Sequence, residues 1–123
     1  VKDGGIIILV GTCHEGLGER VFEEWMTGAD SPASLVERVR RDFQLGGPKA
    51  AAIALVLEQT DIYLVSEMEP DFVRSIFLQP YATVQDALDA ALAQLGLDAT
   101  VLVMPVAGST LPVLRNLWQV SCP

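Results

Sequence analysis

The sequence lacks the features that place a protein on a membrane or on nucleic acid. Its longest apolar run, Ala50 to Leu57, is far short of the roughly 20 residues needed to cross a bilayer. It has 8 Lys and Arg against 16 Asp and Glu, a formal charge of −8, so nucleic acid and anionic membrane surfaces would repel it. The densest basic cluster, residues 38–41, is typical of the exposed side of one helix. We expect no nucleic-acid partner and no membrane partner.

Cysteine and histidine are also scarce. The two cysteines, Cys13 and Cys122, form neither a CxxC motif nor a zinc-binding spacing, which favours a reduced, cytoplasmic protein over a disulfide framework. His14 is the single histidine, so this chain alone supplies neither a two-histidine metal site nor a pair of histidines acting as acid and base. We therefore expect no metal site and assign no catalytic residue. The first residues lack the pattern of a signal peptide, and the chain opens almost directly on a strand, as a piece of a longer protein would.

Half of the 123 residues are hydrophobic, which is enough for the core of one domain. Apolar, β-branched runs over 6–10, 61–65 and 100–104 predict strands, and Pro80 limits residues 77–82 to a brief edge segment. Alternating strands and helices predict a single α/β domain with a small, mostly parallel sheet flanked by helices. We expect helices over 21–28, 31–43, 50–57, 69–76 and 83–95. The helix over 50–57 should be the most buried, because nearly all of its residues are apolar.

Ligands of such sheets bind outside the carboxyl ends of the strands. Residues 11–18, 66–69 and 105–112 should gather there. The glycines of 11–18 match neither nucleotide-binding fingerprint. Cys13, His14 and Glu15 place a thiol, an imidazole and a carboxylate after the first strand, but adjacent side chains point in different directions and do not make a triad by themselves. They form either one wall of a cleft or an ordinary polar loop.

A second candidate site begins the helix over 50–57. Gly47 leaves backbone uncovered before this helix, and Lys49 puts a positive charge in its first turn, where the helix dipole disfavours a cation. This arrangement favours an anionic ligand such as a carboxylate or phosphate; the alternative is a solvated surface lysine. Ser109 and Thr110, after Gly108, offer hydroxyl and N–H groups to a small oxyanion, or simply form a turn.

Several segments together resemble one known family. They are Asp3-Gly4-Gly5 with the isoleucine-rich strand, the loop with Cys13 and Gly16, Leu45 to Ala50, the strand Tyr63 to Ser66, and the ending Val103 to Pro112. In this order they are similar to the C-terminal domain of the nickel-dependent lactate racemase family. The resemblance covers the chain nearly to Pro112.

The resemblance implies that residues 1–123 are the C-terminal α/β domain of a larger two-domain racemase or epimerase, whose site lies between the domains. A nickel-pincer nucleotide on the N-terminal domain would take a hydride from the α-carbon of lactate or a related 2-hydroxy acid, and two N-terminal histidines would act as acid and base. Lys49 matches the lysine that this domain lends to the substrate. The family's glutamine just upstream is replaced here by Gly46, Gly47 and Pro48, which leaves the choice among hydroxy acids and sugars open.

On this interpretation the partners are the N-terminal domain and the substrate, and the chain alone carries no cofactor and no activity. Trp118 is a candidate for the domain interface. Two alternatives stay open. The first is a small-anion-binding or regulatory module without catalysis, and the second is a fold-stabilising fragment without a ligand.

Overall fold

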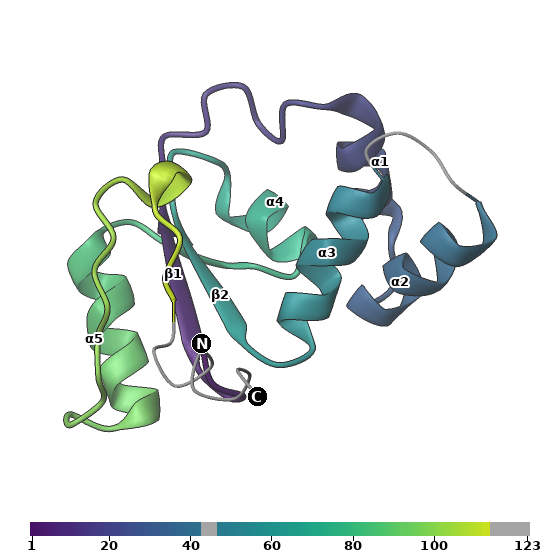
Figure 1. The fold of residues 1–123 in the computed structure, drawn as a ribbon. Helices are drawn as coiled ribbons and strands as arrows, with labels where there is room; N and C mark the ends of the chain where they lie inside the picture. Colours follow the sequence, from purple (N-terminus) through teal and green to yellow (C-terminus); the bar gives the residue numbers. More distant parts are fainter. Residues whose placement is uncertain (43–46, 114–123) are drawn as a thin grey trace, which may run out of the picture.

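Three parallel strands form the centre of the domain (Figure 1). The computed structural model describes residues 1–42 and 47–113. Strand β1 (Ile6–Val10) pairs with β2 (Asp61–Val65), which pairs with β3 (Gln79–Tyr81). The register places Ile8 opposite Tyr63 and Leu64 opposite Pro80. Pro80 lies on an edge strand, where the absence of an N–H donor is tolerated.

Helices cover both faces of the sheet, so the structure has three layers. Helix α5 (Val84–Leu95) packs on one face, where Ala87 and Ala91 meet Tyr63 and Val65. The alternate strand residues Ile62 and Leu64 are also buried, because successive side chains of a strand point to opposite faces. On that second side lie helices α1 (Arg20–Gly28), α2 (Pro32–Arg41), α3 (Gly47–Leu57) and α4 (Pro70–Ser75).

The second side has its own core, which is built around Trp25. The indole is fully buried, and apolar side chains of α1, α2 and α3 and of Ile76, which directly follows α4, form a cluster with it. The buried members of this cluster are Phe22, Trp25, Met26, Leu35, Ala50, Ala54 and Ile76. Burial of large apolar side chains of this kind is the main stabilising contribution to such a domain.

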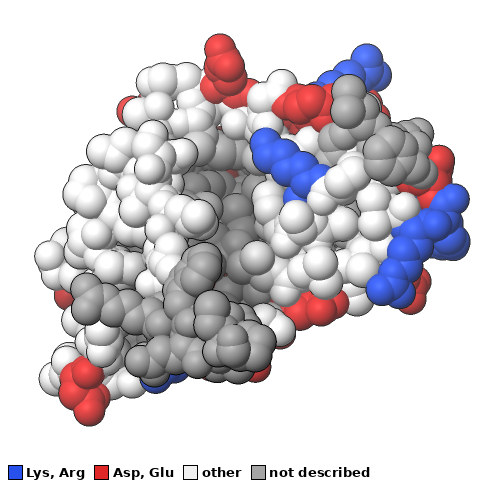
Figure 2. All heavy atoms as spheres, in the orientation of Figure 1, with Lys and Arg blue, Asp and Glu red and all other residues white. Residues whose placement is uncertain are grey.

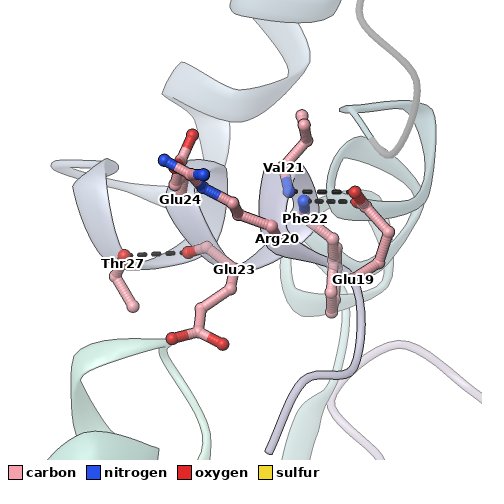
Figure 3. A network of polar contacts seen from close by, with 7 residues as sticks. All are labelled: Glu19, Arg20, Val21, Phe22, Glu23, Glu24 and Thr27. Carbon is pink, nitrogen blue, oxygen red and sulfur yellow. Dashed lines mark hydrogen bonds and ion pairs between the residues drawn. The ribbon is translucent and has the colours of Figure 1, made fainter.

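Side-chain caps determine where the helices begin. Both carboxylate oxygens of Glu19 accept hydrogen bonds at the start of α1, from the N–H of Val21 at 3.0 Å and of Phe22 at 2.7 Å (Figure 3). Ser31 caps α2 and Thr83 caps α5. These side chains satisfy N–H groups that have no partner inside the helix. The predicted starts at Ser31–Pro32 and at Thr83 are confirmed.

One prediction about the fold is wrong. Residues 100–104 form no strand; an apolar, β-branched sequence is insufficient without a hydrogen-bonding neighbour. The prediction that the helix over 50–57 is the most buried is confirmed, because α3 has four buried residues and every other described helix has three or fewer. Its burial is confined to one side, and Leu55 is 51 % exposed. The short strand within 77–82 is confirmed. The end of the second predicted helix at Phe43, and also Trp118 and Cys122, lie outside the described residues.

Charge is unevenly distributed over the face shown in Figure 2. Basic side chains gather at the end of the molecule where α2 lies, and its last turn carries Arg38, Arg40 and Arg41. Cations are favoured there by the negative end of the helix dipole. In the described part of the chain, no helix is both long and apolar enough to cross a membrane.

Candidate functional site

A shallow pocket of about 520 Å³ lies at the carboxyl ends of β1 and β2. The loops that follow these strands form it, and they are joined directly by a hydrogen bond of 3.2 Å from the N–H of Glu67 to the carbonyl oxygen of Thr12. Ligands of parallel sheets bind at this edge. The lining residues are Thr12, Cys13, His14, Gly16, Glu67, Met68, Glu69 and Phe72.

A side-chain contact also crosses between the two loops. Nδ1 of His14 lies 3.2 Å from Oε2 of Glu67, and the two side chains are 71 % and 67 % exposed. A pair this exposed contributes little to stability, so its main effect is to orient the imidazole. The structure therefore brings two of the predicted loop residues, Cys13 and His14, into the pocket; Glu15 is not among the residues that line it.

Cys13 has a backbone conformation that few non-glycine residues adopt. Its φ is +56°, in the left-handed region, and its carbonyl oxygen accepts the N–H of Gly16 at 3.0 Å. The thiol is free and half-buried.

Lys49 lies near the same end of the sheet but outside this pocket. Helix α3 runs antiparallel to the strands, so its first turn lies at their carboxyl end (Figure 1). The ammonium Nζ is 4.6 Å from the centroid of the Phe22 ring, a cation–π distance. Lys49 is exposed, and no carboxylate of residues 1–42 or 47–113 forms an ion pair with it. Its charge is therefore open to an external anion.

Gly47 has a packing role at the start of α3. It is buried, and a Cβ atom at this position would lie 2.6 Å from Cη2 of Trp25. Helix α3 begins at Gly47, ahead of the predicted range 50–57, and Pro48 is its second residue. The close approach of backbone to indole requires glycine here.

Ser109 and Thr110 lie at an exposed 3₁₀ turn, η1 (Ala107–Ser109). The turn uses much of the hydrogen-bonding capacity that could serve an anion. Ser109 N–H donates to the carbonyl of Val106 at 3.0 Å, and Thr110 N–H donates to that of Ala107 at 3.2 Å. The Thr110 hydroxyl also donates to the Val106 carbonyl, at 2.8 Å. Within this turn the Ser109 hydroxyl remains available.

Glu67 and Phe72 belong to the pocket. Glu67 lies within residues 66–69, which were expected at this edge of the sheet, whereas Phe72 was not expected there. The signal that places Glu67 at this edge is the adjacency of two parallel strands, whose following loops must meet. Phe72 lies in α4, and no local pattern indicates which side of so short a helix faces the pocket.

The structure thus defines an α/β domain of the open parallel-sheet class, with a pocket at its carboxyl edge. A family model, the lactate racemase C-terminal domain, matches residues 1–111. The chain belongs to this family.

Two comparisons agree with this assignment. The chain is 26 % identical over 109 residues to the lactate racemase of Thermoanaerobacterium thermosaccharolyticum, a match that covers 85 % of the chain and 26 % of that protein. The solved structure of the lactate racemase apoprotein from the same organism is similar with a TM-score of 0.71 and 22 % identity, over 77 % of the chain and 24 % of that structure. The chain spans about a quarter of the length of each of these relatives.

Proposed function

We propose that this chain is the substrate-cleft domain of a racemase or epimerase that acts on lactate or a related 2-hydroxy acid. The observation that carries the proposal is the exposed ammonium of Lys49, which pairs with no described carboxylate, in the first turn of α3 at the carboxyl edge of the sheet. A 2-hydroxy acid carries a carboxylate, and a charge-assisted hydrogen bond from an ammonium suits this group. The positive end of the α3 dipole adds to the attraction.

Family membership supports the proposal independently of the geometry around Lys49. The relatives are named lactate racemase, and this chain matches about a quarter of their length. We therefore propose that an N-terminal domain completes the site, and that the pocket between the β1 and β2 loops faces it. The phenyl ring of Phe22, 4.6 Å from Nζ, holds the Lys49 side chain on one side and limits where the substrate carboxylate can lie.

The nickel-pincer nucleotide that the family implies does not fit the described residues of this chain. Among residues 1–42 and 47–113, no three His, Cys, Asp or Glu side chains are close enough to hold a metal ion. The N-terminal domain would therefore hold the nucleotide, which supplies an acceptor for a hydride from the substrate when it is bound. The part of this chain in the reaction is to bind and orient the carboxylate and to exclude water from it.

A racemisation assay of the whole protein tests the proposal. The parent gene is expressed with the enzymes that build the cofactor, and wild type is compared with Lys49→Ala on a panel of 2-hydroxy acids. A hydrogen bond to a charged group contributes about 1.5–3 kcal/mol, so kcat/KM should fall by about 10- to 100-fold. Lys49→Arg should keep part of the rate, because it keeps the charge.

Lys2→Ala is the matched control, since Lys2 is an exposed lysine that precedes β1. Its removal lowers the net charge equally but should leave kcat/KM unchanged. An active protein whose rate survives Lys49→Ala would show that Lys49 does not bind the substrate. A gene that encodes no further domain would refute the racemase proposal itself.

A further inference from the structure

The pocket between the β1 and β2 loops has a negatively charged lining. Glu67 and Glu69 belong to it, and among the described residues that line it only His14 can carry a positive charge. A carboxylate oxygen of Glu23 lies nearby, 3.9 Å from the position that a Cβ atom on Gly16 would occupy. Even a protonated imidazole would leave the lining with a net negative charge. A carboxylate group of a ligand is therefore repelled from this pocket.

Several polar groups of the pocket are free to bind hydroxyl groups. Oε2 of Glu67 contacts Nδ1 of His14 at 3.2 Å, which leaves Nε2 of the imidazole for a ligand. A hydroxyl group suits Nε2 in either charge state of the ring, because it can both donate and accept a hydrogen bond. No residue in the ranges 1–42 and 47–113 donates to Oε1 of Glu67, and the carboxylate of Glu69, just before α4, caps no N–H of that helix. These carboxylate oxygens can accept hydrogen bonds from hydroxyl groups.

The size and the apolar part of the pocket indicate a ligand with a longer chain than lactate. Beyond its hydroxyl-bearing carbon, lactate has only a methyl group, whereas the pocket has a volume of about 520 Å³. Met68 and Phe72 give it an apolar surface for carbon atoms, and such a surface with a few polar groups is typical of small-molecule sites. A methyl group would leave the polar groups without partners once another domain covers them, which is unfavourable.

The first turn of α1 connects this pocket with Lys49. The ring of Phe22 lies 4.6 Å from Nζ of Lys49, and the next residue, Glu23, lies beside Gly16 of the pocket lining. Because one helical turn makes both contacts, the ammonium group and the pocket are neighbours at the carboxyl edge of the sheet. A single ligand can therefore place its carboxylate at Lys49 and the rest of its chain in the pocket.

We propose that this pocket selects, among 2-hydroxy acids, the monocarboxylic acids whose chain carries further hydroxyl groups beyond the reacting carbon. Lys49 binds the carboxylate, as in the function proposed above, on which this assignment rests. Nε2 of His14 and the carboxylates of Glu67 and Glu69 bind the hydroxyl groups, and the two negative charges exclude a second carboxylate. Unfavourable contacts with a competing ligand are a general source of specificity. Glu67 is in addition a positioning residue, because it orients the imidazole of His14.

Three acids with carbon chains of equal length test the selection in the whole protein, expressed with the enzymes that build its cofactor. Threonate carries hydroxyl groups along its chain, 2-hydroxybutyrate carries none beyond the reacting carbon, and malate carries a second carboxylate. We expect kcat/KM for threonate to exceed that for either competitor by on the order of tenfold or more. An equal or higher kcat/KM for malate or for 2-hydroxybutyrate would overturn the proposal.

Amide variants of the two glutamates separate charge from shape. Glu67→Gln and Glu69→Gln each remove one negative charge and keep an oxygen acceptor, so the preference for threonate over malate should fall by about tenfold. Asp71→Asn is the matched control, because Asp71 pairs with Arg74 at 3.0 Å and is not among the residues that line the pocket. It changes the net charge equally and should leave the preference unchanged. Equal effects of all three substitutions would show that the pocket does not set the preference.

His14→Ala tests the imidazole. It should lower kcat/KM for threonate and leave kcat/KM for 2-hydroxybutyrate unchanged, because only threonate has hydroxyl groups for Nε2. A general loss of folding would lower both values equally. Equal losses for the two acids would therefore contradict the assignment of His14.

Ligand binding to the 123-residue chain separates this inference from the racemase function. If the whole protein acts on no 2-hydroxy acid, the function proposed above fails, and NMR spectra of the chain decide whether the pocket selects hydroxylated acids. Threonate should shift the imidazole signals of His14, whereas malate at the same concentration should not. The absence of a shift with threonate, or an equal shift with malate, would overturn the inference.

Discussion

The backbone of Gly47 approaches the indole of Trp25 so closely that a Cβ atom on Gly47 would lie 2.6 Å from Cη2 and 2.7 Å from Cζ3 of the ring. The indole has little room to retreat, because Trp25 is fully buried and the guanidinium carbon of Arg38 lies over the ring, 4.3 Å from its centroid. This contact locks the first turn of α3 against α1. Lys49 follows two residues later, so its position depends on the same contact.

Gly47→Ala should destabilise the domain. Forcing a methyl group into a packed contact of this kind costs about 1–3 kcal/mol, and we expect that decrease in the free energy of unfolding measured with urea. Gly28→Ala is the control, since a Cβ atom there would have no neighbour within 4 Å. It should leave stability unchanged or raise it by up to about 1 kcal/mol, because alanine restricts the unfolded chain. Equal effects of the two substitutions would contradict the packing role.

Substitution of Glu19 and of Glu24 compares the contribution of a helix cap to stability with that of a surface ion pair. Glu19 caps the N–H groups of Val21 and Phe22, whereas Glu24 pairs with Arg20 at 2.8 Å on the exposed surface of α1 (Figure 3). Glu19→Ala should lower the free energy of unfolding by about 1 kcal/mol. Glu24→Ala should lower it by about 0.3–0.5 kcal/mol or less. Chemical denaturation of both variants measures the difference, and a larger loss in Glu24→Ala would show that the cap is unimportant.

The helices of this domain were predictable because their signals are local. Ser31 before Pro32 and Thr83 before Asp86 predict starts that the structure confirms, since a cap depends on residues three positions apart. The strand predicted at 100–104 failed for the opposite reason. A strand depends on a neighbour elsewhere in the chain, and residue composition does not identify that neighbour.

The candidate site shows the same difference between local signals, which the sequence carries, and contacts between distant residues, which it does not. Because ligands bind at the carboxyl ends of parallel strands, the position of Cys13 and His14 directly after a predicted strand is enough to place their loop at that edge. The contact between His14 and Glu67 joins two loops, and the two residues are 53 positions apart in the sequence. No spacing pattern in the sequence predicts such a contact. Gly47 was expected to leave backbone uncovered for a ligand, yet its contact with Trp25 gives it a packing role. Such a contact depends on how two helices meet, which the sequence around Gly47 does not reveal.

Tyr63 should make stability depend on pH in the alkaline range. Its burial raises the pKa of the phenol above the ordinary value of 10.0, and the nearby Tyr81 and Asp61 raise it further. The unfolded chain therefore releases the Tyr63 proton at lower pH than the folded chain does. The stability linked to this proton is fully present below pH 10.0 and is lost as pH rises through the folded pKa.

Tyr63→Phe removes this titrating group and should flatten the fall in the free energy of unfolding above pH 10.0. The hydroxyl of Tyr63 donates to Oε1 of Gln94 at 3.0 Å, so the variant should also be less stable by about 0.5–1.5 kcal/mol at neutral pH. Urea denaturation from pH 7 to 11 separates a change of slope from this constant offset. Parallel curves for the two proteins would mean that the Tyr63 proton does not contribute.

The 123-residue chain on its own should neither racemise lactate nor bind nickel stoichiometrically. Its single histidine, His14, is already paired through Nδ1 with Glu67 at 3.2 Å. Racemisation that moves a proton to and from the substrate hydroxyl on both faces of the substrate needs two acid–base groups, one for each face. Nickel content of the purified chain by elemental analysis, together with a lactate racemisation assay, checks both statements, and the whole protein serves as the positive control. Activity or one equivalent of nickel on the chain alone would mean that its own residues hold the catalytic group. The racemase proposal would then have to place the centre of the reaction within the pocket between the β1 and β2 loops, with His14 as its acid and base.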